Sequence, residues 1–100
     1  MDFIEIKNLL KERSLLHMND PSIEKYREKL INLLSISARD TIEFLESCNK
    51  DEVLLISEVF EEIAYNLQSN DYINCLKIID MKYPDLNLTN IIEIAKEYME

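Results

Sequence analysis

The chain contains no glycine among its 100 residues, and this absence restricts its fold more than any other feature of the sequence. Glycine takes up left-handed backbone geometry at no steric cost and lets a backbone approach a ligand closely. The glycine-rich loops that bind dinucleotides or nucleotide phosphates are therefore excluded, and so is the nucleophile elbow of hydrolases. Turns must use Asn and Asp, which also tolerate left-handed geometry.

Turn-forming residues divide the chain into segments. They stand at Asn19-Asp20-Pro21, Asn49, Ser69-Asn70-Asp71 and Pro84-Asp85-Leu86-Asn87. Between these positions, apolar residues recur with the period of an amphipathic helix. We predict helices over Asp2–His17, from Pro21, from Ala38, over Lys50–Gln68, over Asn70–Lys82 and over Thr89–Met99.

The connections between the predicted helices are short, so neighbouring helices should run antiparallel. No segment alternates between apolar and polar residues for long enough to predict a strand. We therefore expect an all-α protein, in which about six short antiparallel helices pack as helical hairpins in one bundle-like domain spanning residues 1–100.

Residues typical of helix starts support these boundaries. Asp20 followed by Pro21 is a favourable cap for the second helix, and Ser37 precedes the third. Asn49 with Glu52 three residues later fits a capping box, which predicts a helix that begins at Lys50.

The predicted helix over Lys50–Gln68 has an apolar face and an acidic face. A rotation of about 100° per residue aligns its large apolar side chains, which are Val53, Ile56, Phe60, Ile63 and Leu67. The opposite side holds Asp51, Leu54, Glu58 and Tyr65, with Glu61 and Glu62 beside them. In the third helix, Ala38, Ile42 and Leu45 are predicted to face inward, which leaves Asp40 and Glu43 facing outward.

The negative charge is concentrated in the second part of the chain. The sequence has 20 acidic and 11 basic residues, a formal net charge of −9. Residues 1–39 hold six acids and seven bases, whereas residues 40–100 hold fourteen acids and four bases. Within Asp40–Glu62, eight acids accompany a single base, Lys50. A field of one sign at this density favours a cationic partner and repels nucleic acid and anionic membranes.

Two interpretations of the acidic face remain open. It is either a solvated surface, with Leu54 and Tyr65 covered by other helices, or an interface in which an aromatic anchor is surrounded by charge. Under the second interpretation, the third helix shares the surface. The candidate partner-binding residues are then Asp40, Glu43, Asp51, Leu54, Glu58, Glu61, Glu62 and Tyr65.

No group of residues predicts catalysis, so we do not expect an enzyme. His17 is the only histidine, so a triad or a His-based metal site would need unrelated partners, and we expect His17 to lie at a helix end or in solvent. Glu58, Glu61 and Glu62 imitate a carboxylate metal site, but the Glu-x-x-His pairs of helical di-metal proteins are missing. We expect neither a metal nor a cofactor. The basic residues of the first two helices are expected to pair with neighbouring glutamates rather than to bind nucleic acid.

The sequence also predicts a cytoplasmic location. Its first residues lack the basic segment and apolar run of a secretory signal, and no stretch is long and apolar enough to cross a membrane. Cys48 and Cys75 are isolated in the sequence, which is typical of packed thiols in a reducing compartment.

One pattern lies within residues 55–95, about two-fifths of the chain. It consists of Ser57-Glu58-Val59-Phe60-Glu61-Glu62-Ile63, Gln68-Ser69, Ile73, Tyr83-Pro84, Leu86 and Ala95. In this pattern the chain resembles small acidic bacterial immunity proteins, which are encoded beside polymorphic or contact-dependent growth-inhibition toxins. The chain departs from the pattern in having very few basic residues after position 40.

This resemblance implies a cognate inhibitor that has no activity of its own and binds a toxin C-terminal domain with a basic surface. A nuclease is the expected toxin, because nuclease active sites are cationic. The alternative is a non-catalytic helical adaptor or regulatory module that binds another basic protein.

Overall fold

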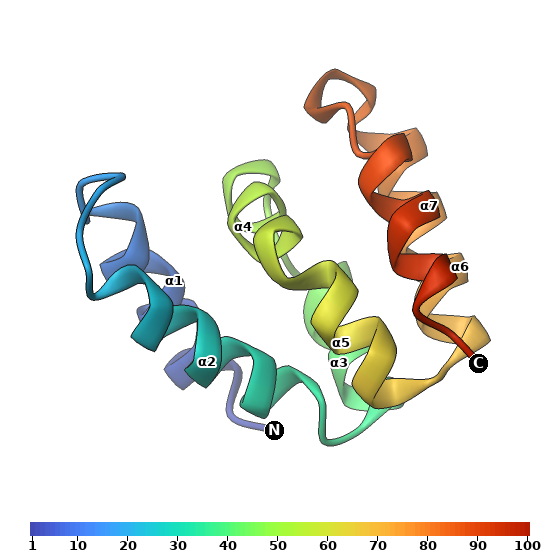
Figure 1. Cartoon of the computed structure of the whole chain (residues 1–100), viewed down its shortest axis with the longest axis horizontal. Helices are drawn as coiled ribbons and strands as arrows, with labels where there is room; N and C mark the ends of the chain where they lie inside the picture. Colours follow the sequence, from blue (N-terminus) through green and yellow to red (C-terminus); the bar gives the residue numbers. More distant parts are fainter.

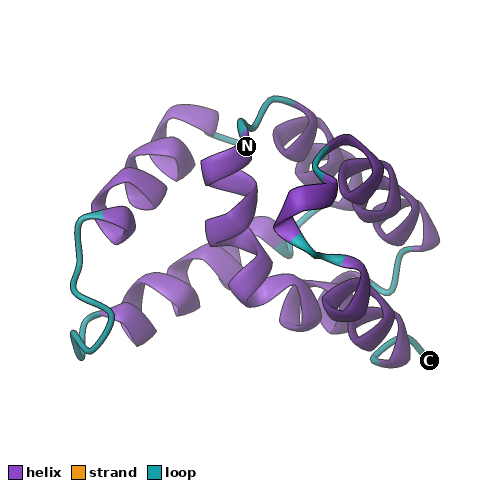
Figure 2. Cartoon of the chain, turned by 90° about the horizontal axis from the view of Figure 1, so that it is seen from above, coloured by secondary structure: helices purple, strands orange, loops and turns teal.

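The computed structural model describes residues 1–100, and every regular element in it is helical. The helices are α1 (Phe3–Ser14), α2 (Ile23–Leu34), α3 (Ala38–Glu46), α4 (Lys50–Ile56), α5 (Phe60–Leu67), α6 (Asn70–Lys82) and α7 (Thr89–Glu97). Two short 3₁₀ turns, η1 (Ser57–Val59) and η2 (Pro84–Leu86), lie between them. Short loops join the helices and no strand is present (Figure 2). The predicted all-α class is confirmed.

The helices form three hairpins that stand side by side (Figure 1). In this view α2, α4–α5 and α7 make a front layer, and α1, α3 and α6 lie behind them. The main contacts between hairpins join α5 to α7 and α3 to α6, while α1 packs against α2 and α4. The predicted packing as helical hairpins is therefore confirmed, and it gives the molecule two different faces.

The core is one cluster of 21 buried hydrophobic residues contributed by all three hairpins. The stripe predicted from Val53 onward is inside, since Val53, Ile56, Phe60 and Ile63 are fully buried. Tyr72 is also fully buried, and its hydroxyl donates a hydrogen bond to the Phe60 carbonyl at 3.1 Å. No helix combines the length and the apolarity that crossing a bilayer requires.

The predicted helix over Lys50–Gln68 is present as the contiguous segments α4, η1 and α5, but it is not α-helical throughout. The helix is interrupted at η1, where the Ser57 hydroxyl donates to the Leu54 carbonyl at 2.5 Å and Val59 has φ −124° and ψ 13°. A straight helix would leave Val59 beside the buried stripe. The tighter 3₁₀ turn changes the rotation of the chain and places Val59 fully inside the core.

The predicted inward face of the third helix is only partly correct. Leu45 is buried, but Ala38 and Ile42 are half-buried, while Thr41 and Phe44 are fully buried. The Thr41 hydroxyl donates to the last carbonyl of α2 at 2.6 Å, so this polar side chain is satisfied inside the protein. The predicted face left out Phe44, whose ring packs edge-on against Phe3 of α1 with the ring centres 5.1 Å apart.

The predicted helix starts differ in how well they match. Asn49 forms the expected capping box, because its side chain accepts from the Glu52 amide and the Glu52 carboxylate accepts from the Asn49 amide, both at 2.9 Å. The second helix begins at Ile23 rather than at Pro21. Asp20 instead accepts from the Ser22 amide at 2.8 Å and orders the turn before the helix.

Left-handed residues end two of the helical segments, as a chain without glycine requires. They are Gln68 (φ 48°) after α5 and Asn87 (φ 55°) after η2. Gln68 also holds the C-terminal residues: its side-chain amide donates to the Tyr98 carbonyl at 3.1 Å and accepts from the Glu100 amide at 2.7 Å. These bonds place Tyr98 next to α5.

Candidate binding surface

The eight predicted partner-binding residues lie in several different surroundings. Glu61, Glu62 and Tyr65 line one pocket. Asp51 and Leu54 line a second hollow between α1 and α4. Asp40 lines a third, near the start of α1, Glu43 is exposed on α3, and Glu58 is held within the protein. The structure thus does not gather all eight residues into one site.

Glu58 is engaged by cations of the same chain. Its carboxylate accepts two hydrogen bonds from the Arg13 guanidinium, at 2.8 and 3.1 Å, and its carbonyl accepts one from Arg27 at 2.9 Å. The Arg13 side chain is 15% exposed and that of Glu58 is 31% exposed, so the pair is only partly shielded from water and salt. Glu58 therefore joins η1 to α1 and α2.

Two other acids of the predicted surface are also paired. Glu43 lies 3.7 Å from Arg39, and Asp40 lies 3.9 Å from the amino group of Met1. Of the basic residues in the first two helices, Lys7, Arg13 and Arg27 pair with glutamates as expected, and Lys7 lies 2.8 Å from Glu52. Lys11, Lys25 and Lys29 form no ion pair.

The hollow at Asp51 and Leu54 has mixed charge. It encloses about 590 Å³ between α1 and α4, and its walls include Lys7, Lys11 and Arg13. Asp51 and Leu54 are exposed. Because three bases accompany two acids in its lining, this hollow does not select strongly for a cationic partner.

The pocket at Tyr65 is different, and we call it the tyrosine pocket. It encloses about 450 Å³ and is lined by Ile31, Glu61, Glu62, Tyr65, Asn66 and Tyr98. These residues come from α2, α5 and the segment after α7, which belong to the front layer (Figure 1). Tyr65 is 56% exposed and Tyr98 is 47% exposed. Other helices therefore do not cover Tyr65, nor the exposed Leu54.

Two contacts hold the walls of the tyrosine pocket together. Asn66 donates to the Ser35 hydroxyl at 3.0 Å and so ties α5 to the end of α2. Gln68 fixes the Tyr98 backbone on the other side. The sequence contains no sign that Tyr98 would lie here, because the bonds made by Gln68 join residues that are far apart in the chain.

The electrostatics of the tyrosine pocket favour a positive charge. Neither Glu61 nor Glu62 forms an ion pair, and no Lys or Arg lines the pocket. One carboxylate oxygen of Glu62, Oε2, is buried without a hydrogen-bond partner. Carboxylates and tyrosine rings both attract Lys and Arg side chains, so the side chains that line the pocket suit a basic residue of another protein.

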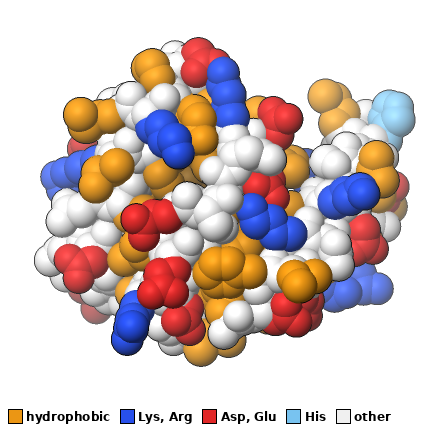
Figure 3. Space-filling model, turned by 180° about the vertical axis from the view of Figure 1, so that it is seen from behind, with side chains coloured by type: hydrophobic (Ala, Val, Ile, Leu, Met, Phe, Trp, Pro, Cys, Tyr) orange, Lys and Arg blue, Asp and Glu red, His pale blue; other side chains and the backbone are white.

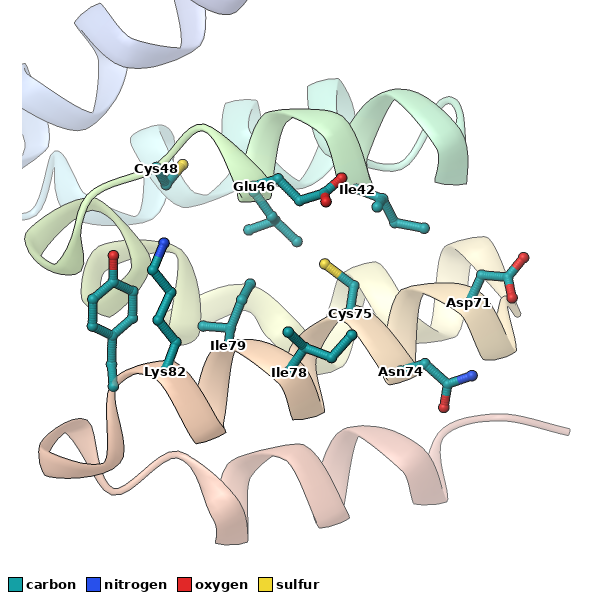
Figure 4. A pocket seen from close by; sticks show the side chains of 11 residues that line it. Ile42, Glu46, Cys48, Asp71, Asn74, Cys75, Ile78, Ile79 and Lys82 are labelled. Carbon is teal, nitrogen blue, oxygen red and sulfur yellow. The ribbon is translucent and has the colours of Figure 1, made fainter.

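A further hollow, which the sequence did not predict, lies in the back layer between α3 and α6 (Figure 4). This α3–α6 groove encloses about 470 Å³, and most of its lining is hydrophobic. Cys48 and Cys75 lie in it as free thiols. Burial raises the pKa of Cys48 to about 12 and the pKa of Cys75 to about 11, so both are neutral at physiological pH and add apolar surface.

The structure contains no group of three or more His, Cys, Asp or Glu side chains placed to hold a metal ion. The surfaces that the fold offers are the tyrosine pocket in front, the α3–α6 groove behind, and the mixed hollow beside α1. Comparisons with models of known protein families, with curated protein sequences and with solved structures found no match for this chain.

Proposed function

We propose that the protein is an immunity protein, which binds and neutralises a cognate bacterial toxin domain by contacting its basic surface through the tyrosine pocket. The observation that carries this proposal is the combination of Tyr65 and Tyr98, both about half exposed, with Glu61 and Glu62, which lack an internal cation. A surface of this kind gives a partner an aromatic anchor and a charge complement at one point.

The charge of the chain supports the same mechanism at longer range. Of the eight acids in Asp40–Glu62, four make no ion pair within the protein: Glu46, Asp51, Glu61 and Glu62. Unneutralised acids on one part of a surface steer a basic partner and raise the rate of encounter. A toxin that acts on nucleic acid carries a cationic active site, and fast capture limits the time for which it is free in the cell.

The toxin class comes from the resemblance of residues 55–95 to immunity proteins, and this segment contains the α5 wall of the tyrosine pocket. The binding chemistry is independent of that resemblance. A helical adaptor or regulatory module for another basic protein would use the same pocket, so the identity of the partner separates the two functions.

Co-production with the protein encoded by the neighbouring gene tests the proposal. We expect the chain to restore growth to cells that make this neighbour and to co-elute with it in size-exclusion chromatography. The variant Tyr65→Ala combined with Glu61→Lys should lose both effects. Glu5→Lys is the matched control, because Glu5 is an exposed acid on α1, outside the tyrosine pocket, and it should protect like the wild type.

Failure of the wild-type chain to protect cells or to form a complex would contradict the toxin assignment. If the chain instead forms a complex with a different basic protein, and that complex depends on the tyrosine pocket, the adaptor function would be favoured.

A further inference from the structure

The α3–α6 groove is an apolar surface that no segment of the chain covers. Its floor and walls include Ile42 and Leu45 of α3 and Ile78 and Ile79 of α6. The Ile79 and Cys75 side chains of α6 point toward α3 (Figure 4). Ile78 is 66% exposed. From behind, several apolar side chains are exposed among acidic and basic ones (Figure 3). Exposed apolar side chains that adjoin a groove make it a candidate interaction surface.

Charged residues mark the ends of this groove with opposite signs. Asp71 lies at one end and Lys82 at the other, with the Glu46 carboxylate between them near Cys75 (Figure 4). None of the three forms an ion pair within the protein. The Lys82 ammonium lies 5.2 Å from the centre of the Tyr83 ring, which keeps it at its end of the groove. A partner must therefore offer a base at one end and an acid at the other.

The shape of the groove suits a helix. α3 and α6 run in the same direction on either side of it, and α6 contributes Cys75, Ile78 and Ile79, which have the three-to-four-residue spacing of one helix face. A third helix can place its own side-chain ridge between two such helices. The thiols of Cys48 and Cys75 add apolar surface to the groove, and its residues include no group of three or more His, Cys, Asp or Glu side chains placed to hold a metal ion.

We propose that the α3–α6 groove binds one amphipathic helix of a partner protein, running antiparallel to α6, with an acidic first turn beside Lys82 and a basic last turn beside Asp71 and Glu46. This charge order is the one that the helix dipole favours within a helix. The groove is in the back layer, whereas the tyrosine pocket is in the front layer (Figure 1). The two surfaces can therefore be occupied at the same time, and this inference does not depend on the function proposed above.

A labelled synthetic peptide tests the groove. The peptide is as long as α6, has apolar residues along one helix face, and carries acidic residues in its first turn and basic residues in its last. We expect saturable binding by fluorescence anisotropy, with NMR shift changes at Ile42, Cys75 and Ile78 but not at Tyr65 or Tyr98. A peptide of the same composition with its charged ends exchanged should bind about tenfold more weakly.

Two variants of α6 distinguish specific binding in the groove from nonspecific binding of the peptide to the protein surface. Ile78→Lys places a charge in the groove and should weaken peptide binding by about tenfold or more. Met81→Lys makes the same change at a residue that is 82% exposed on the same helix but does not line the groove, so binding should stay within about twofold of the wild type.

Absence of saturable peptide binding would overturn the proposal. Equal weakening by Ile78→Lys and Met81→Lys would do the same, and so would a dimer of the protein that fills the groove with a second copy. Equal binding of the two charge isomers would contradict the antiparallel orientation.

Discussion

Glu58, Glu61 and Glu62 lie close together in the sequence, yet their surroundings give them different roles. Glu58 accepts two hydrogen bonds from Arg13, while Glu61 and Glu62 face a pocket without a cation. A helical wheel gives only the direction of each side chain around its own helix and contains no information on contacts with other helices. The partner of Glu58 is 45 residues away in the chain, so the sequence pattern could not distinguish the structural acid from the two that remain available.

Removal of Glu58 should therefore cost more stability than removal of Glu61. Glu58→Ala leaves the mostly buried Arg13 guanidinium without its acceptor, and we expect a loss of about 1–3 kcal/mol in the free energy of unfolding. Glu61→Ala removes no ion pair and should change the free energy of unfolding by less than about 0.5 kcal/mol. Urea unfolding measures both values. Equal values would mean that the Arg13–Glu58 pair does not contribute to the folded state.

Phe60 and Tyr65 provide a second contrast within α5. Phe60 is fully buried, so Phe60→Ala should lower the free energy of unfolding by about 3–5 kcal/mol. Tyr65→Ala removes a ring that is more than half exposed, and we expect a change below about 1 kcal/mol. Thermal and urea unfolding check this prediction. Unfolding of Tyr65→Ala at low denaturant would show that Tyr65 is a core residue and would remove it from the binding surface.

The two thiols make stability depend on pH in alkaline solution. Burial raises the pKa of both above the ordinary value of 9.0, to about 12 for Cys48 and about 11 for Cys75. Above pH 9 the unfolded chain loses these protons while the folded protein keeps them, so the free energy of unfolding should fall as the pH rises. Urea titrations of the wild type and of the Cys48→Ala, Cys75→Ala double variant, at about pH 8 and about pH 10, should show a larger decrease for the wild type. An equal decrease would contradict the buried state of the thiols.

At the level of the helices, boundaries with local chemical causes could be predicted and those with distant causes could not. The start of α4 follows from the Asn49 capping box, and the end of α6 follows from Pro84, since the residue before proline avoids helical geometry. The 3₁₀ turn at η1, where Val59 is fully buried, has no such local signal. The predicted face of α3 left out Phe44, which is fully buried against Phe3 of α1, whereas Ile42 is half-buried.

The capping box at Asn49 has a measurable effect. Asn49→Ala removes the acceptor for the Glu52 amide, and we expect a loss of about 1 kcal/mol in the free energy of unfolding. Ser22 precedes α2 but its side chain makes no capping bond, so Ser22→Ala should be near neutral. Equal losses for the two variants would contradict the assigned role of Asn49. Chemical denaturation under the same conditions measures the free energy of unfolding of both variants.

Considered as a whole, the molecule presents different chemistry on its two layers. The front layer carries the tyrosine pocket with two unpaired glutamates, and the back layer carries the apolar α3–α6 groove. The sequence predicted three members of the tyrosine pocket, Glu61, Glu62 and Tyr65. It did not predict Ile31 and Tyr98, which reach the pocket from α2 and from the segment after α7 through tertiary packing.

Binding kinetics with the product of the neighbouring gene test the central claim, that a basic partner docks in the tyrosine pocket. We predict that Tyr65→Ala accelerates dissociation by about thirtyfold or more, with a smaller effect on association, because it removes the central anchor. Glu61→Lys should mainly slow association and reduce its dependence on salt. If both variants still form the complex and their association and dissociation rate constants equal those of the wild type, the partner binds elsewhere and the claim is contradicted.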